Sequence, residues 1–390
     1  MSNRAPVMTF VVVLVLVAMA LAQTFTTLYN FDEIPDGGNP IGALIQDTAG
    51  NLYGTTSVGG YGDDESDGVV FEVTTSGTET VLHRFKGSDG AVPEAPLLRD
   101  SEGNLYGTTT EGDTSGNGVV FKIETAGKET LLHSFAGGTS DGCTPKQGLV
   151  MDEKGNLYGT TEACGAFNLG TVFKLTAKGK ETLLHSFAGG ASDGDSPAGG
   201  RLLMDKAGNL YGVTVFGTGT GCHDFGGCGM VYKLSTNGKL TVLHSFPGGS
   251  SDGCFPVGTV NMDKGGNLYG TTTYCGSSNS GTVWVLSTEG KETILHNFAG
   301  GASDGCAPQA GVVMDSKGNL YGSTLQCGAD GAGTVWELSK KGAIRLLHSF
   351  DGADGQDPIG ELLRTASGEL FGTTSEGGGG SYGTVWSYVP

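Results

Sequence analysis

A six-residue tract, Asn-Leu-Tyr-Gly-Thr-Thr or a close variant, occurs seven times in the 390-residue chain and constrains its fold more than any other feature. Successive copies begin 50 to 58 residues apart, at Asn51, Asn104, Asn156, Asn209, Asn267, Asn319 and Glu369. A repeat of this length is one unit of supersecondary structure that buries its apolar face by packing on its neighbours. The chain is therefore expected to be one repeat architecture and not two or three unrelated domains.

Three further tracts recur in the same order in the units. Gly-Thr-Val-Phe or a variant ends in an aromatic residue, Leu-His-Ser-Phe or a variant follows it, and Asp-Gly with a later proline precedes the next unit. In the third unit, β-branched and aromatic runs at 148–151, 156–161, 171–175 and 181–187 are separated by turns containing Gly, Asp and Lys. Four antiparallel strands in about 50 residues are typical of a propeller blade. We predict an all-β, seven-bladed β-propeller of four-stranded blades.

The two ends of the chain are expected to complete one blade. The seventh unit stops after its third strand, at 384–389, and residues 24–31 have the pattern of the missing fourth strand. Pairing of these segments would close the last blade and leave no free sheet edge in the ring. We expect a single propeller over residues 23–390. Its blades are expected at approximately 40–87, 93–136, 145–188, 197–247, 256–299, 308–351 and 358–389 plus 24–31.

Composition agrees with a turn-rich β protein. Glycine occupies 71 positions without a Gly-X-Y period, which excludes collagen, and 17 Phe, 12 Tyr and 3 Trp argue against a disordered linker. Each glycine in a helix interior costs about 1 kcal/mol relative to alanine, so long helices are not expected.

The N-terminus predicts a signal peptide over residues 1–22. Arg4 precedes an apolar run that ends in Ala20-Leu21-Ala22, and the run is short for a membrane span. An uncleaved anchor is the alternative. Without Arg4, 21 basic residues face 41 acidic ones, which leaves a charge of −20 and disfavours nucleic acid as a partner. We expect a secreted monomer with no membrane span in the mature chain, and a periplasmic or cell-surface location is the alternative.

The repeated motifs resemble a known family. The series Asp-x-x-Gly-Asn-Leu-Tyr-Gly-Thr-Thr, Gly-Thr-Val-Phe and Leu-His-Ser-Phe is similar to the GloVer (Gloeo-Verruco) tandem-repeat family of secreted bacterial proteins. The resemblance covers nearly all of the chain after residue 22. It implies a bacterial, exported protein, and it supplies no established activity and no catalytic residues.

The eight cysteines follow the repeat and predict four disulfides. In three units one cysteine follows Asp-Gly, another follows it 21 residues later, and the two positions hold cysteine together or not at all. The entry to the first strand of a blade lies beside the exit from the second, within disulfide reach. The expected pairs are Cys143–Cys164, Cys254–Cys275, Cys306–Cys327 and the leftover pair Cys222–Cys228. A zinc site is the alternative for Cys222, His223, Asp224 and Cys228.

Repetition also indicates which polar residues are structural. Six of the seven histidines occupy one equivalent position in the fourth strand, whereas a catalytic histidine is normally unique. The Asp-Gly aspartates recur in all seven inter-blade loops, where an Asx-turn is the expected role and calcium binding is the alternative. These residues are His83, His133, His185, His244, His296 and His348, with Asp36, Asp89, Asp141, Asp193, Asp252, Asp304 and Asp354.

Candidate ligand sites are expected where the sevenfold repeat is broken. Unit 4 carries a longer insertion at 218–229 between its second and third strands, and unit 1 carries an acidic segment at the corresponding place. The insertion supplies the candidate ligand-binding residues His223, Asp224 and Phe225, and the acidic segment supplies Tyr61. Asp63, Asp64, Glu65 and Asp67 are candidate calcium ligands. Solvated loop decoration without a ligand is the alternative for both segments.

Two classes of function fit these observations. One is a secreted, non-catalytic propeller that binds an extracellular glycan, protein or surface component through its loop-decorated face. The other is an extracellular propeller enzyme of the polysaccharide lyase or hydrolase type, with His223 and the aspartates as acid–base groups. No catalytic residue is predicted, because no carboxylate pair or Ser-His-Asp set stands out from the repeat.

Overall fold

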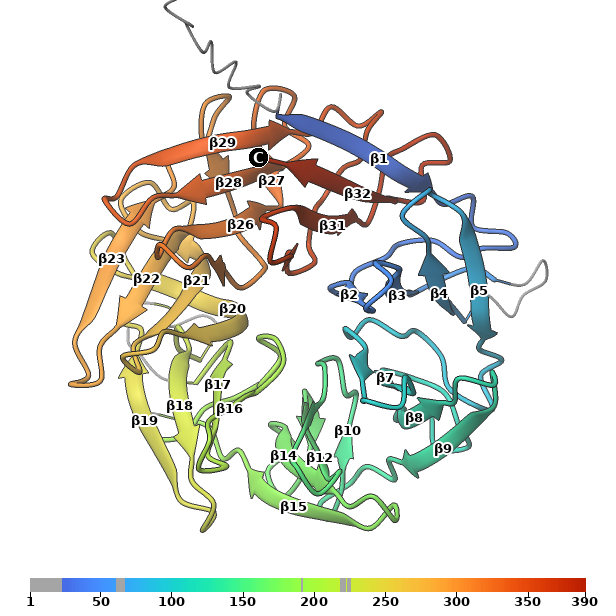
Figure 1. Ribbon diagram of the computed structural model, residues 1–390. Coiled ribbons are helices and arrows are strands. Elements are labelled where there is room, and N and C mark those ends of the chain that lie inside the picture. Colours follow the sequence, from blue (N-terminus) through green and yellow to red (C-terminus); the bar gives the residue numbers. More distant parts are fainter. Residues whose placement is uncertain (1–22, 61–66, 191, 218–221, 223–225) are drawn as a thin grey trace, which may run out of the picture.

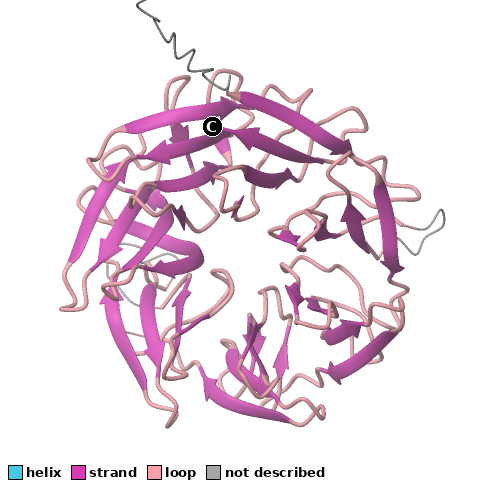
Figure 2. Cartoon of the chain, in the orientation of Figure 1, coloured by secondary structure: helices cyan, strands magenta, loops and turns pink. Residues whose placement is uncertain are grey.

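The computed structural model describes residues 23–60, 67–190, 192–217, 222 and 226–390, and all regular elements within these residues are β-strands. Seven four-stranded antiparallel sheets surround a central channel as blades (Figure 1). Figure 2 shows the same ring built of strands and loops. The predicted seven-bladed β-propeller is confirmed. In the part of the chain described, no helix could cross a membrane.

The blades are numbered in chain order, and their strands are given from the channel outward (Figure 1). Blade 1 contains β2 (Ile45–Gln46), β3 (Leu52–Thr56), β4 (Val69–Val73) and β5 (Glu79–Arg84). Blade 2 contains β6 (Leu98–Arg99), β7 (Leu105–Thr109), β8 (Val119–Ile123) and β9 (Glu129–Ser134). Blade 3 contains β11 (Val150–Met151), β12 (Leu157–Thr161), β14 (Thr171–Leu175) and β15 (Glu181–Ser186). Blade 4 contains β16 (Leu203–Met204), β17 (Leu210–Thr214), β18 (Met230–Leu234) and β19 (Leu240–Ser245).

The other three blades repeat this order. Blade 5 contains β20 (Gly253–Met262), β21 (Leu268–Cys275), β22 (Thr282–Leu286) and β23 (Glu292–Asn297). Blade 6 contains β25 (Val313–Met314), β26 (Leu320–Thr324), β28 (Thr334–Leu338) and β29 (Ile344–Ser349). Blade 7 contains β30 (Leu363–Arg364), β31 (Leu370–Thr374), β32 (Thr384–Val389) and β1 (Thr24–Asn30). Two short ladders pair β10 (Gly142–Cys143) with β13 (Ala163–Cys164), and β24 (Gly305–Cys306) with β27 (Gln326–Cys327).

The N-terminal strand closes blade 7 as the sequence predicts. β1 pairs antiparallel with β32, from Thr24 opposite Val389 to Asn30 opposite Thr384. Phe31, directly after β1, is fully buried and packs against Phe71 of blade 1 with the ring centroids 5.1 Å apart. The ring therefore closes by pairing the two ends of the described chain.

Aromatic residues from two of the repeated tracts form the contact between neighbouring blades. The phenylalanine that ends Leu-His-Ser-Phe meets the aromatic residue of the next blade's Gly-Thr-Val-Phe tract, as in Phe135 against Phe173, with centroids 5.2 Å apart and planes at 70°. The glycine of Asn-Leu-Tyr-Gly makes room for that second ring. A Cβ on Gly159 would lie 2.6 Å from Cζ of Phe173, which no real contact tolerates. The recurring glycine is thus required by the aromatic core.

The Asp-x-x-Gly turn before each second strand is organised by its aspartate. In blade 3, Asp152 Oδ1 accepts hydrogen bonds from the backbone N–H groups of Lys154 and Asn156, at 2.9 Å each. Its Oδ2 accepts from Asn156 Nδ2 at 2.7 Å and from the Tyr158 hydroxyl at 3.0 Å. Equivalent contacts occur in blades 1 to 6 at Asp47, Asp100, Asp152, Asp205, Asp263 and Asp315.

The histidines of the fourth strands contact the inter-blade aspartates. A bulge between the third and fourth strands shifts their register, so that Val172 lies opposite His185 and Phe173 opposite Leu183. The bulge adds local twist, and the outer strands run along the rim of the ring (Figure 1). His185 Nε2 lies 3.0 Å from the carboxylate of Asp193. In blade 7 the hydroxyl of Tyr29 takes the place of histidine and donates to Asp36.

The first strand of most blades is shorter than expected. In blade 3 the predicted strand at 148–151 is reduced to Val150–Met151, because only these two residues pair with the second strand. A Cβ on Gly148 would lie 2.7 Å from Cγ of Pro96. Close packing around the channel therefore replaces ladder pairing at this point.

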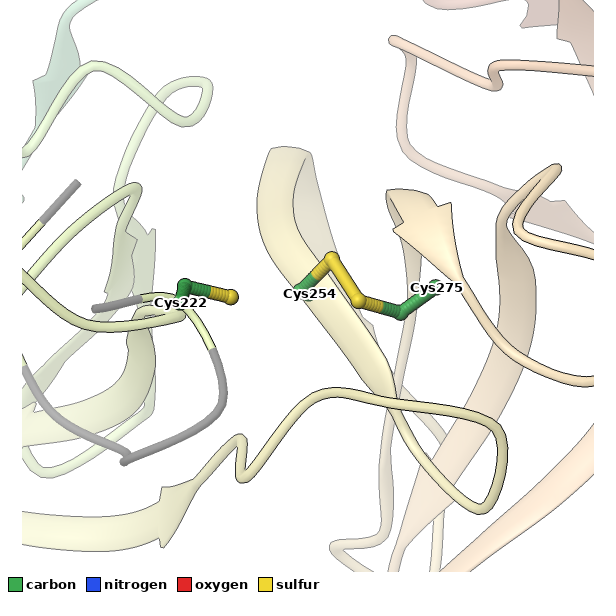
Figure 3. A group of neighbouring side chains, drawn as sticks. All are labelled: Cys222, Cys254 and Cys275. Atoms are coloured by element: carbon green, nitrogen blue, oxygen red, sulfur yellow. A yellow bond between two sulfur atoms is a disulfide. The ribbon is translucent and has the colours of Figure 1, made fainter. Parts of the chain in front are cut away.

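All four predicted disulfides are present, namely Cys143–Cys164, Cys222–Cys228, Cys254–Cys275 and Cys306–Cys327. The zinc alternative for Cys222 and Cys228 is wrong for the oxidised chain, because these sulfurs bond to each other. Figure 3 shows Cys222 beside the Cys254–Cys275 disulfide, and the sulfurs of these three residues lie within 4.8 Å of one another. Cys222 of blade 4 thus lies next to blade 5.

Candidate functional site

Most of the ligand-binding residues predicted from the sequence lie outside the described residues. These are Tyr61, Asp63, Asp64, Glu65, His223, Asp224 and Phe225. Asp67 is described, and its backbone carbonyl accepts a hydrogen bond from the N–H of Val92 at 2.9 Å. Calcium binding by Asp63, Asp64, Glu65 and Asp67 stays a prediction, as does ligand binding by His223, Asp224, Phe225 and Tyr61.

The described residues contain a different candidate site, at the mouth of the central channel. A cavity of about 250 Å³ there is lined by residues from all seven blades. Each blade contributes the residue that directly follows its inter-blade proline, and this position differs from blade to blade. Its occupants are Ile41, Glu94, Lys146, Ala198, Val257, Gln309 and Ile359. The seven blades therefore place the same backbone position at the channel, but the side chains at this position differ in size, polarity and charge.

Each blade has a strained backbone position directly before the proline that leads to this mouth. The residue before the inter-blade proline has a left-handed conformation in every blade, including the β-branched Val92 at φ 57° and Thr144 at φ 58°. Such a conformation costs about 1 kcal/mol or more for a non-glycine residue. In blade 3 it is supported on both sides: the Thr144 N–H donates to the Asn117 carbonyl of blade 2, and the Thr144 carbonyl accepts from the Glu162 N–H.

Blades 2 and 3 form an acidic sector of the mouth, which we define as Glu94, Glu111, Lys146 and Glu162. Lys146 Nζ lies 2.9 Å from Glu162 Oε2. Burial raises the pKa of Glu94, Lys146 opposes this, and the carboxylates of Glu162 and Glu111 add to it. Burial opposes the charge on Lys146, but its hydrogen bond to Glu162 raises the pKa overall. Three carboxyl groups against one ammonium make this sector acceptor-rich.

Blades 4 and 5 carry an aromatic sector, which we define as Phe216, Phe255 and Tyr274, and Phe255 lies two residues before Val257, which lines the cavity. The rings of Phe216 and Phe255 meet edge to face, with centroids 5.5 Å apart and planes at 71°. Phe255 and Tyr274 meet in the same way, at 6.2 Å and 85°. Tyr274 is 45 % exposed, so its ring offers apolar surface to solvent.

Deeper in the channel, Arg201 of blade 4, Thr259 of blade 5 and Glu361 of blade 7 line the cavity. Burial raises the pKa of Glu361, and the charge of Arg201 and a hydrogen bond with Thr259 oppose the shift. The channel thus carries one more carboxyl group, outside the acidic sector.

Sequence reasoning missed this mouth, although the repeat contains the signal. Most residues of the acidic and aromatic sectors occupy two repeat positions: the one after the inter-blade proline, and the one six residues after the leucine of Asn-Leu-Tyr. Phe255 directly precedes its proline, and Glu162 lies one residue before the second position. At the latter position the seven units hold Val58, Glu111, Ala163, Phe216, Tyr274, Gln326 and Glu376. Variation within otherwise uniform repeats marks both positions, but only the fold shows that they meet.

Solved structures share the fold at low sequence identity. A streptogramin B lyase aligns with a TM-score of 0.59 and 14 % identity, covering 94 % of this chain and 97 % of that one. Virginiamycin B lyase from Staphylococcus aureus aligns with a TM-score of 0.59 and 12 % identity, covering 94 % and 99 %. The extracellular domain of a hybrid two-component system from B. thetaiotaomicron gives 0.61 and 13 %, covering 94 % and 41 %. No curated protein matches the sequence.

The sequence family is clear by contrast. The model of the Gloeobacter/Verrucomicrobia repeat matches residues 15–224 and again residues 217–390, so together the two matches span all seven blades. The resemblance found in the repeated motifs is therefore confirmed, and this chain belongs to the Gloeobacter/Verrucomicrobia repeat family.

Proposed function

We propose that this chain is an exported, non-catalytic binding protein that holds a glycan at the mouth of its central channel. The observation that carries the proposal is the asymmetry of the ring around that mouth, with Phe216, Phe255 and Tyr274 on blades 4 and 5 and Glu94, Glu111 and Glu162 on the neighbouring blades 2 and 3. An aromatic face packs on the apolar C–H face of a sugar ring, and carboxylates accept hydrogen bonds from its hydroxyl groups. A concave site with apolar walls and few polar groups suits such a ligand.

The negative charge of the site and of the whole chain indicates which class of glycan would bind. The acidic sector has three carboxyl groups and one lysine, and the whole chain has a formal charge of −19. Like charges across a binding surface disfavour association. The mouth therefore fits a neutral or amino sugar better than a uronic acid polymer.

Export is part of the same proposal. The segment at 1–22 reads as a signal peptide, and four disulfides in one chain suit an oxidising compartment outside the cytoplasm. A periplasmic, surface-attached or fully secreted location would each give the site access to glycans.

A glycan array with the purified chain from residue 23 tests the proposal, followed by titration calorimetry with the best ligand. Y274A should weaken binding at least about tenfold, because losing an aromatic anchor costs about 1.4 kcal/mol or more. F167A is the matched control, since Phe167 is 59 % exposed on the loop between β13 and β14. Equal affinity of Y274A and wild type would contradict the site. Repeating the array with calcium and with a chelator tests the Asp63, Asp64, Glu65 and Asp67 prediction.

An enzyme acting on a carbohydrate is the second candidate, and Glu361 is the observation that favours it. Its carboxyl group lines the channel cavity, and burial raises its pKa, as a general acid requires. If the ligand found on the array is cleaved, E361Q should abolish turnover and leave binding intact. Unchanged turnover in E361Q would exclude this residue as the acid.

A further inference from the structure

Two compact groups of metal-ligating side chains lie between blades, away from the channel mouth. Between blades 2 and 3, His133 of β9, Asp141 of the connecting loop and Glu181 of β15 place one ligand atom each within 4.8 Å of one another. Between blades 4 and 5, His244, Asp252 and Glu292 do the same. One imidazole nitrogen and two carboxylates are a donor set that Zn²⁺ accepts, with a fourth position for water.

In each group, one carboxylate oxygen of the glutamate is buried without a hydrogen-bond partner. Oε1 of Glu181 and Oε1 of Glu292 are buried without a hydrogen-bond partner, and so is Nε2 of His133. The electrostatic neighbours of Glu181 are Asp141 and His133, and no lysine or arginine is among them. Those of Glu292 are Asp252 and His244. Two carboxylates share each group without a permanent cation, which is unfavourable in a half-buried site.

The equivalent positions between other blades provide an internal comparison. Leu240 replaces the glutamate between blades 3 and 4, and Ile344 replaces it between blades 5 and 6. In these two places the histidine and aspartate lie 3.0 and 3.1 Å apart, within hydrogen-bond distance.

Where glutamate is present, the distance between histidine and aspartate varies. It is 3.5 Å for His133 and Asp141, 3.4 Å for His83 and Asp89 beside Glu129, and 3.2 Å for His244 and Asp252, which form a hydrogen bond. Two ligands on a tetrahedral ion at about 2.0–2.2 Å are about 3.3–3.5 Å apart. The distance between His133 and Asp141 is therefore that of two ligands of one metal ion, and the distance between His244 and Asp252 is slightly shorter.

We propose that His133, Asp141 and Glu181, and likewise His244, Asp252 and Glu292, each bind one divalent transition-metal ion of the Zn²⁺ type. Each ion would join the outer strand of one blade to that of the next, β9 to β15 and β19 to β23. The sites are separate from the proposed glycan site, and neither proposal depends on the other.

Zinc titration of the oxidised, chelator-treated protein tests this, in excess magnesium to suppress weak carboxylate binding. The double variant E181Q/E292Q should bind two fewer Zn²⁺ ions per chain than the wild type. Replacement of Zn²⁺ by Co²⁺ should give the visible absorption of a tetrahedral site in the wild type, and this absorption should be lost in the variant. Equal stoichiometry in the two proteins, or no saturable zinc binding by the wild type, would overturn the proposal.

A gain-of-site variant keeps the test decisive if E181Q/E292Q fails to fold. L240E restores the third ligand beside His185 and Asp193, between blades 3 and 4. It should add one Zn²⁺ ion per chain, and L240Q, which matches its size but not its charge, should add none. If L240E folds and adds no ion, this donor set does not bind zinc in this fold.

Discussion

At the scale of single residues, two kinds of carboxyl group respond to their surroundings in opposite directions. Burial tends to raise the pKa of Asp152, but hydrogen bonds from Asn156, Lys154 and Tyr158 lower it overall. Burial raises the pKa of Glu181 to about 7, and the neighbouring Asp141 adds to this. The first group stabilises the folded chain when it is charged, and the second when it is protonated.

The pH dependence of stability should therefore have two limbs in the metal-free protein. The turn aspartates stabilise the folded protein at any pH above their unfolded pKa, which is about 3.9. This stabilisation is lost as the pH falls through the lower pKa values that they have in the folded protein. Glu181 has a raised folded pKa, so its contribution is complete below its ordinary pKa of 4.5 and is lost as the pH rises toward about 7. E181Q should thus raise the guanidinium midpoint at pH 8 and leave it nearly unchanged at pH 4.5.

The exposed Glu153 provides the control for this pH experiment, because E153Q should leave the midpoint unchanged at both pH values. An equal effect of E181Q at pH 4.5 and pH 8 would show that Glu181 acts through packing and not through its charge.

The sequence could identify the structural role of the histidines but not their full environment. Six copies at one repeat position predict a structural residue, and each histidine does contact the aspartate of the following loop. Glu181 could not be assigned to His133 in advance, because it lies 48 residues further along the chain, on the next blade. Contacts within one unit can be predicted from the spacing of the repeat, whereas contacts between units depend on how the blades are arranged around the ring.

At the scale of elements, strands 2, 3 and 4 of each blade follow the sequence pattern closely. In blade 3 the expected runs at 156–161, 171–175 and 181–187 become Leu157–Thr161, Thr171–Leu175 and Glu181–Ser186. The first strand is shorter than its apolar run in the sequence. The conformation of that run beside the channel depends on packing against neighbouring blades as well as on pairing with its own second strand. The alternation of apolar and polar residues does not show whether a run pairs within its own sheet or packs on a neighbouring blade.

The disulfides should differ in their effect on these elements. Cys143–Cys164 spans 21 residues and Cys222–Cys228 spans 6, so the first restricts the unfolded chain more. Loop-closure entropy gives a loss of about 3 kcal/mol for C143S/C164S and about 2 kcal/mol for C222S/C228S. The free energy of unfolding in guanidinium chloride measures both. A larger loss in C222S/C228S would mean that anchoring the insertion against Cys254–Cys275 outweighs the entropy of the loop.

At the scale of the whole molecule, the number of blades and the closure of the ring were predictable, and the candidate site was not. Seven copies of three motifs and six of the fourth fix the number of blades, and the missing fourth strand of the last unit identifies its partner near the N-terminus. The channel mouth depends on which repeat positions converge on the axis, and no single unit contains that information. Within their own units Glu94 is a loop residue and Tyr274 a residue near the end of a strand, and neither indicates a binding site until the seven blades are placed in a ring.

Ring closure makes the last prediction. Removing residues 23–31 exposes the edge of β32 and removes the Phe31 contact with Phe71, so the truncated chain should aggregate or fail to fold. The matched control moves residues 24–31 to the C-terminus through a short turn after Pro390. Thr24 pairs with Val389, so the moved segment can form the same ladder as a hairpin. Circular dichroism and size-exclusion chromatography should show a folded monomer for the rearranged chain and for a chain beginning at Gln23. A folded monomer from the truncated chain would mean that six complete blades and an open seventh suffice.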